Sequence, residues 1–165
     1  MLSDANNGSF YRHVGVYGVC VKQDQLLVIE KILGPYTGQF DLPGGRLEDY
    51  ESLDQALKRE FREETGLAVT KLVQLGVWDF NVLWTRTDNS IEHLHHVAIM
   101  YEVTIDVQKF QHAIGVFSGQ DSQAAKWIPL QDVTPSNSSP LVLQAIQWLQ
   151  APTIPLTSQF FDYRK

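Results

Sequence analysis

Residues 45–67 read GRLEDYESLDQALKREFREETGL and contain the helix that decides the fold. Ser52 and Gln55 have the spacing of a capping box, which marks the start of a helix. Gly66 stands where a left-handed residue commonly ends one. We therefore predict a helix over Leu53–Thr65.

Two glutamates lie on the face of this helix that should be buried. At about 100° per residue, three apolar side chains form one stripe: Ala56, Leu57 and Phe61. Glu60 and Glu64 fall in the middle of that stripe. Like charges four residues apart destabilise a helix, and more strongly where water is displaced. We therefore expect a cation beside them, and grouped carboxylates suit Mg²⁺ or Mn²⁺.

Arg59 is the positive side chain closest to these acids along the helix. It can reach Glu63 one turn later, which we expect to leave Glu60 and Glu64 without a cation on their own face. Taken alone, an E-x-x-E-E triplet is more often a solvated acidic edge. The residues around the triplet favour the metal site.

Nine positions fill the pattern G-x5-E-x7-R-E-U-x-E-E-x-G-U, in which U is a bulky apolar residue. They are Gly45, Glu51, Arg59, Glu60, Phe61, Glu63, Glu64, Gly66 and Leu67. With this motif the chain resembles the Nudix hydrolases, over roughly residues 14–149 when the order of expected elements is included. The resemblance implies an α/β (α+β) fold, an α/β/α sandwich with a mixed β-sheet.

The resemblance also implies the activity. A metal-dependent pyrophosphohydrolase of this kind cleaves a phosphoanhydride bond in a nucleoside diphosphate linked to another group, such as an oxidised nucleoside triphosphate, ADP-ribose or a related nucleotide. The alternative is a Nudix-fold binding or regulatory module that senses a nucleotide without turnover. Such modules usually lose box acids, and this chain keeps them.

Roles for individual residues follow from the same resemblance. Mg²⁺, with Mn²⁺ as a substitute, is expected on Glu60, Glu63, Glu64 and the main-chain carbonyl of Gly44. Arg59 is expected to orient Glu63, and Glu51 to brace the loop or a water on the metal. The general base is either a box glutamate or an acid from a distant loop, and the best loop candidate is Asp121, followed by Glu92. The residues assigned to catalysis are Glu51, Arg59, Glu60, Glu63 and Asp121.

Contacts with the substrate are assigned to one cation and to aromatic rings. Arg46 follows the double glycine directly and is placed to contact phosphate. Aromatic faces stack on nucleobases, and the candidates are Tyr36, Trp78, Phe80 and Trp84, each of which has an alternative place in the core or at its rim. His93 and His95 share one face of a strand, and His96 points the other way.

Outside the helix, strands and loops alternate. We predict a hairpin of residues 14–21 with 26–30, strands over 68–77 and 91–103, a short strand around 125–128, and a helix from Pro140 to about Leu149. Residues 1–12 are expected to form a flexible N-terminus, residues 13–150 the domain, and residues 151–165 a tail that no pattern places.

Composition limits the partners. The formal net charge of −6 with scattered Lys and Arg argues against duplex nucleic acid, but a bound cation still allows a small phosphate ligand. We find neither a signal-peptide pattern nor a membrane-length apolar run, so no membrane partner is expected. The single Cys20 fits a reducing cytoplasm. The oligomeric state is left open between monomer and homodimer.

Overall fold

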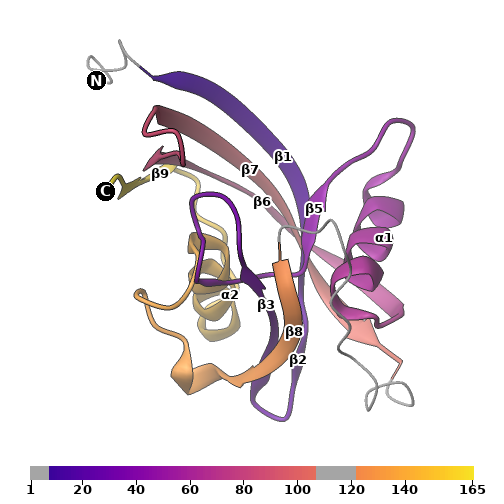
Figure 1. The fold of residues 1–165 in the computed structure, drawn as a ribbon. Helices are drawn as coiled ribbons and strands as arrows, with labels where there is room; N and C mark the ends of the chain where they lie inside the picture. The colour runs from indigo at the N-terminus through magenta and orange to yellow at the C-terminus, as the bar shows by residue number, and fades with distance from the viewer. Residues whose placement is uncertain (1–7, 107–121) are drawn as a thin grey trace.

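The computed structural model describes residues 8–106 and 122–165 of the chain. Strands in these ranges are β1 (Ser9–Val19), β2 (Val21–Lys22), β3 (Gln25–Lys31), β4 (Phe40–Asp41), β5 (Gly44–Arg46), β6 (Val69–Thr85), β7 (Ile91–Ile105), β8 (Ser122–Pro129) and β9 (Gln159–Tyr163). The helices are α1 (Leu53–Thr65), the short η2 (Leu130–Asp132) and α2 (Pro140–Gln150). The two α-helices lie on opposite sides of the strands (Figure 1).

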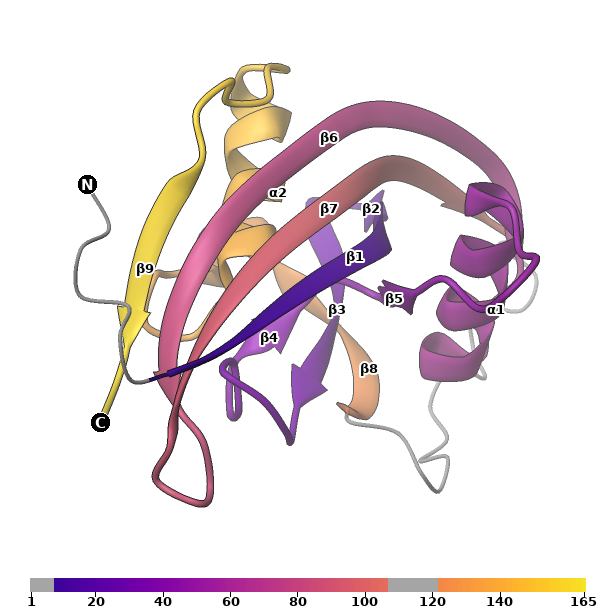
Figure 2. The ribbon, with the colours of Figure 1, turned by 90° about the horizontal axis from the view of Figure 1, so that it is seen from above.

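The strands form two sheets. One has the order β5-β1-β7-β6-β9, with parallel pairs β1/β7 and β6/β9 and antiparallel pairs elsewhere. In the other, β3 pairs antiparallel with β2, β4 and β8. The long β6 and β7 arch across the molecule, and β9 runs along the outer edge of β6 (Figure 2). This mixed α+β architecture confirms the predicted fold class.

Helix α1 has the predicted bounds, and its ends are formed by the predicted residues. The backbone N–H of Ser52 donates to Gln55 Oε1 at 2.9 Å. Gly66 adopts the left-handed conformation with φ of 71°, and its N–H donates to the Arg62 carbonyl at 2.8 Å. Phe61 is fully buried, and it packs with residues of β1, β3 and β7 in the cluster beneath α1.

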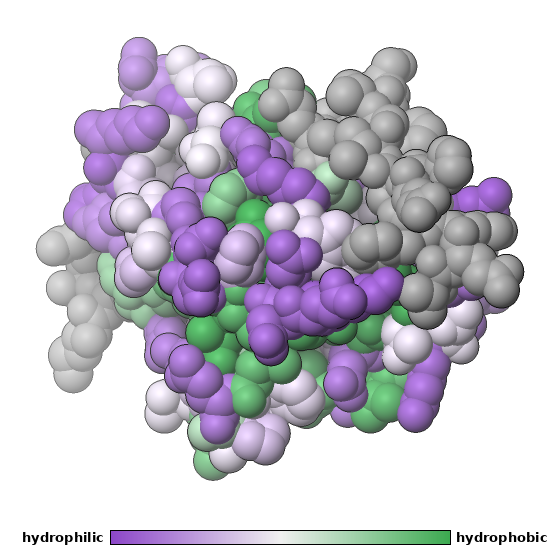
Figure 3. Space-filling view, turned by 90° about the horizontal axis from the view of Figure 1, so that it is seen from below, coloured by the Kyte–Doolittle hydropathy of each residue, from purple (hydrophilic) through white to green (hydrophobic). Residues whose placement is uncertain are grey.

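Helix α2 covers the other face. Pro140 is its first residue, and the Ser139 hydroxyl accepts a hydrogen bond from the Val142 N–H at 3.3 Å. Its buried residues Leu141, Val142 and Ala145 join a second core cluster that includes inward side chains of β6 and β7. In the ranges that the structure describes, neither helix is long and apolar enough to cross a membrane. Seen from below, hydrophobic residues form patches bordered by hydrophilic ones (Figure 3).

The predicted first hairpin is largely wrong. Strand β1 lies between β5 and β7, and of the predicted first strand only Val21 pairs with β3, together with Lys22 of the expected turn. Inner residues of β1 are buried on both faces, and a continuous apolar run does not show which strand is its neighbour. Strand β1 also begins at Ser9, so residues 9–12, expected to be flexible, pair with β7.

Two further boundaries differ from the prediction. Strand β6 continues to Thr85 through the aromatic stretch that was expected to end it, because Trp78 and Phe80 point inward as strand residues. The tail that no pattern placed contains β9, which pairs with β6 in parallel. The predicted helix at Pro140 and the strand around residues 125–128 are confirmed.

Candidate active site

A cleft with a volume of about 330 Å³ opens between the box and the inner face of the five-stranded sheet. Strand β1 contributes Tyr11, His13 and Tyr17, and β7 contributes Glu92, Leu94 and His96. Further lining residues come from the end of β3 (Lys31) and the segment after it (Leu33, Gly34, Pro35 and Tyr36), from Asp41, and from the box side (Gly44, Gly45, Arg46, Glu60 and Glu64).

Glu60 and Glu64 line the cleft beside the adjacent glycines Gly44 and Gly45. The Gly44 N–H donates to Glu64 Oε2 at 2.8 Å, and Glu64 is only 6% exposed. A Cβ placed on Gly45 would lie 2.8 Å from the Glu60 carboxyl carbon. Gly44 has φ of 147°, and a side chain there would collide with the Val16 carbonyl. The acids that occupy the apolar stripe of α1 therefore reach the cleft through backbone that only glycine permits.

Arg59 binds several box acids at once. Its Nε and Nη2 donate to the two carboxylate oxygens of Glu51, at 2.6 and 2.9 Å. Its Nη1 donates to Glu60 at 2.9 Å and to Glu63 at 3.3 Å, and Nη2 also donates to the Arg46 carbonyl at 3.0 Å. Arg59 therefore reaches Glu63, as expected, but the expectation that it leaves Glu60 without a cation is wrong. The residue before the helix cap folds back and takes the bidentate contact.

Glu51 braces the loop that precedes α1. It accepts the Glu48 N–H at 2.9 Å in addition to the two bonds from Arg59. The hydrogen bonds from Arg59 and Glu48 lower the pKa of Glu51 to about 2. The same bond to Glu51 raises the pKa of Arg59, which is charged in any case. Of the two roles expected for Glu51, the geometry supports bracing of the loop.

Beyond the box acids, tyrosine and histidine side chains of the cleft form a network of hydrogen bonds. The Tyr17 hydroxyl hydrogen-bonds both His96 Nε2 at 2.8 Å and His13 Nε2 at 2.9 Å. The Tyr36 hydroxyl lies 3.4 Å from His96 Nδ1. Burial, reinforced by the nearby charges of His13 and Lys31, holds the pKa of His96 well below its ordinary value. His96 is therefore a neutral imidazole with both ring nitrogens in hydrogen bonds.

The sequence of the chain matches the model of the NUDIX domain over residues 10–150. The chain belongs to the Nudix family. The match covers the box, the cleft and both α-helices, and it ends before β9.

Named relatives match over part of their length. The ADP-ribose pyrophosphatase of Methanocaldococcus jannaschii is 38% identical over 77 residues, which are 46% of this chain and 46% of the relative. The 8-oxo-dGTP diphosphatase of Proteus vulgaris is 38% identical over 64 residues, which are 38% of this chain and 57% of the relative. The matched region thus spans about half the length of these relatives.

Solved Nudix structures share the fold. A MutT NUDIX hydrolase from Burkholderia pseudomallei has a TM-score of 0.64 and 25% identity, covering 83% of this chain and 97% of that one. The NUDIX domain of Shewanella oneidensis NrtR, solved with ADP ribose, has a TM-score of 0.56 and 21% identity, covering 85% and 87%. The second likeness shows the fold alone.

Nudix hydrolases generally use a divalent metal, and the donors of this cleft fit one. Glu60 and Glu64 are hard oxygen ligands on one wall, and Mg²⁺ typically takes one or two carboxylates and keeps waters. Over residues 8–106 and 122–165, no three acidic, histidine or cysteine side chains gather into a complete cage. Glu63 is half exposed and is not among the lining residues. The donor set suits an open Mg²⁺ or Mn²⁺ site better than an all-protein one.

The predicted aromatic contacts require a correction. Trp78 and Phe80 are 2% and 0% exposed, stack on each other at 4.4 Å, and belong to the core beside α2. Phe80 lies behind His96, with 4.8 Å between the ring centroids, so its face is covered. Because these rings fill the core, they do not line the cleft as nucleobase contacts.

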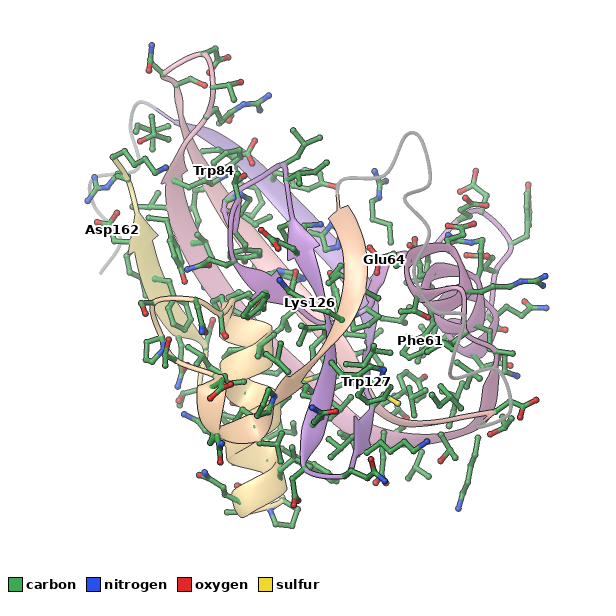
Figure 4. The ribbon with its side chains drawn as sticks, turned by 60° about the horizontal axis from the view of Figure 1, so that its bottom comes forward. Phe61, Glu64, Trp84, Lys126, Trp127 and Asp162 are labelled. Carbon is green, nitrogen blue, oxygen red and sulfur yellow. The ribbon has the colours of Figure 1, made fainter. Side chains whose placement is uncertain are left out.

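Trp84, another aromatic candidate, is not among the residues that line the cleft. The Trp84 indole N–H donates to Glu92 Oε1 at 3.1 Å, which places Trp84 behind a lining residue. In Figure 4, Glu64 lies on the side of α1 that faces the strands, and Trp84 lies at the far end of β6. Asp121, the loop candidate for the general base, lies outside the described residues.

Several lining residues were not predicted. His13, Tyr17 and Lys31 face the cleft, and no local motif marks them because they come from β1 and the end of β3. The alternation of the β7 histidines is confirmed, since His96 faces the cleft and His95 bonds Asp79 of β6 at 2.9 Å. Arg46, predicted to contact phosphate, does line the cleft.

Proposed function

We propose that this chain is a divalent-metal-dependent hydrolase that cleaves a phosphoanhydride bond in a small nucleotide derivative. The observation that carries the proposal is the placement of Glu60 and Glu64. Both carboxylates come from the Nudix box, both line the cleft, and both lie against the Gly44–Gly45 backbone. Two carboxylates grouped in one cleft repel each other, and a divalent cation between them would offset that repulsion in addition to the charge of Arg59 beside Glu60.

Glu60 and Glu64 would hold Mg²⁺ or Mn²⁺, and Glu63 and the Gly44 carbonyl are further proposed ligands. When bound, the metal neutralises charge on a bridging phosphate oxygen and acidifies a water, which are the two main requirements of phosphoanhydride cleavage. The general base stays a prediction among a box glutamate, Asp121 and Glu92, of which Glu92 lines the cleft.

Other residues of the cleft orient the substrate. Lys31 and Arg46 line it next to the box and supply positive charge for phosphate oxygens. Gly44 and Gly45 allow the chain to approach phosphate closely, because neither carries a side chain. Arg59 positions Glu60 through the 2.9 Å bond and fixes the loop through Glu51. These residues bind and align, which is the larger part of catalysis in phosphoryl transfer.

The substrate class proposed is a nucleoside diphosphate linked to a further group. The names of two relatives, ADP-ribose pyrophosphatase and 8-oxo-dGTP diphosphatase, support this class without choosing within it. Net charge supports a small ligand over duplex nucleic acid. The single cysteine, buried and with its pKa raised by burial to about 12, supports a reducing cytoplasmic location.

A nucleotide panel tests the proposal. ADP-ribose, 8-oxo-dGTP, dGTP, NADH and a dinucleoside polyphosphate are each incubated with the protein in Mg²⁺, in Mn²⁺ and in excess chelator, and phosphate-containing products are measured. We expect turnover of at least one compound that needs the metal and is lost in Glu64→Gln. Full turnover in chelator overturns the metal site. Tight binding of a panel member without turnover overturns the hydrolase and favours the sensing module.

A further inference from the structure

The C-terminal strand β9 lies beyond residue 150, where the match to the family ends, and yet it is an integral edge of the five-stranded sheet. It pairs in parallel with β6 from Phe80↔Gln159 to Trp84↔Tyr163. The Asn81 side chain also donates to the Ser158 hydroxyl at 2.9 Å. The strand is therefore fixed in register against the part of β6 that runs behind the cleft.

Alternate residues of β9 face opposite sides of the sheet. Phe161 and Tyr163 point inward, where the Phe161 ring packs edge-on against Phe80 at 5.7 Å. Phe160 points outward and is 50% exposed. One strand thus supplies an inward ring at its end and an outward ring of similar size as a matched control.

Tyr163 contacts the wall of the cleft from behind. Its ring lies edge-on to Tyr36, with 5.9 Å between centroids, and its hydroxyl hydrogen-bonds the Gln39 side chain. Tyr36 lines the cleft and is only 3% exposed. The Tyr36 ring is nearly parallel to His96, at 6.4 Å and 20°, and its hydroxyl lies 3.4 Å from His96 Nδ1. Three rings from β9, the segment after β3 and β7 therefore stand in a row that ends at the cleft.

We propose that Tyr163 is a positioning residue for the substrate: its ring holds Tyr36 against His96 and thereby fixes the wall of the cleft beyond the box acids. The proposal rests on the proposed function, because it takes the cleft as the substrate site. Tyr163 acts on the cleft through Tyr36, whereas the proposed metal ligands come from the box, so its removal should weaken binding more than chemistry. Tyr163 then belongs to the active site as well as to the fold.

Three variants test this: Tyr163→Ala, Tyr163→Phe and Phe160→Ala. The substrate is the member of the nucleotide panel that the wild type turns over fastest. We expect Tyr163→Ala to raise KM by about fivefold, in line with the loss of an edge-to-face ring contact, and to leave kcat within about twofold. Tyr163→Phe keeps the ring and should keep KM near that of the wild type. Phe160→Ala should change neither constant.

A second measurement needs no substrate. NMR signals of the His96 ring in the metal-free protein should move in Tyr163→Ala and stay in place in Phe160→Ala, because only the first change releases Tyr36. If the wild type hydrolyses nothing on the panel, the proposed function fails, and the NMR result alone decides whether Tyr163 positions the cleft wall.

The two readouts also separate positioning from general stability. A lower melting temperature in Tyr163→Ala with unchanged KM and unchanged His96 signals overturns the proposal, since β9 would then only stabilise the sheet. Equal rises of KM in Tyr163→Ala and Phe160→Ala overturn it as well. If Tyr163→Ala does not fold, Tyr163→Leu takes its place, and it must show the same rise of KM and the same shift of the His96 signals.

Discussion

The two ends of the cleft are built in opposite ways. At the box end, Arg59 hydrogen-bonds Glu51 and Glu60, and all three residues belong to one short stretch of chain. At the other end, Tyr17, Tyr36 and His96 come from three separate elements and hydrogen-bond as neutral groups. The comparison shows that the charged chemistry is local in the sequence, and that the shape of the remaining cleft depends on the whole fold.

The largest expected effect is at the box end. Glu64→Gln removes one charge but keeps an oxygen that can accept the Gly44 N–H, so the fold should survive. We expect kcat to fall by about 100-fold or more, because a metal ligand is weakened. Steady-state kinetics on the best substrate measures this. Glu102→Gln, an exposed glutamate of β7, is the control and should be fully active. If Glu64→Gln keeps the kcat of the wild type, Glu64 is not a metal ligand needed for catalysis, and the proposed chemical difference between the two ends of the cleft is wrong.

Arg59→Lys should have the next largest effect. Lysine keeps the charge but cannot reproduce the paired bonds to Glu51 together with the bond to Glu60. We expect kcat/KM to fall by about tenfold, through misplacement of Glu60 and of the loop. Arg62→Lys, on the same helix, is the matched control. Equal activity of the Arg59 variant and the wild type would show that charge alone suffices at the box end.

At the neutral end, His96 should make stability depend on pH between 7 and 5. The pKa of His96 in the fold is held well below its ordinary value of 6.5, so below that pH the unfolded chain binds a proton that the native protein excludes. The free energy of unfolding therefore falls as pH drops, by at most about 1.4 kcal/mol per pH unit for one proton. Urea unfolding of His96→Phe should show a flatter profile, and parallel profiles would contradict a buried neutral imidazole.

Glu51 should give a smaller effect in a more acidic window. Its pKa is about 2 in the fold and 4.5 ordinarily, so its contribution is present above pH 4.5 and is lost as pH falls toward 2. Solvent reaches this ion pair, which keeps the contribution small. Urea unfolding of Glu51→Gln at pH 5, 4 and 3 should lose less stability than the wild type. An identical loss would mean that Arg59 does not hold Glu51 in solution.

The sequence predicted the box end well for a physical reason. The capping residues, the apolar stripe and the misplaced Glu60 and Glu64 all depend on helical periodicity, which short-range spacing records. The bond from Arg59 to Glu63 was predicted, but the paired bonds to Glu51 were not, because Glu51 lies before the cap and its fold-back across the helix follows from the loop. Spacing along a helix does not contain that information.

The neutral end could not be predicted in the same way. Tyr17 and His96 meet because β1 and β7 pair in parallel across about eighty residues of chain, and their sequences do not encode that partnership locally. The same limit explains Trp78 and Phe80, whose aromatic faces suit a base or a core equally well. In the structure, both rings are buried between β6 and α2, so they are core residues.

Calorimetry with and without Mg²⁺, but without substrate, tests the metal site of Glu60 and Glu64 most directly. A cation that binds only the folded protein stabilises it by about 2.7 kcal/mol at a hundredfold excess over its dissociation constant, which is a rise of several degrees in Tm. We predict this rise for the wild type and for Glu102→Gln, and its loss in Glu64→Gln. If Mg²⁺ raises the Tm of all three proteins equally, or of none, the two carboxylates do not form a metal site.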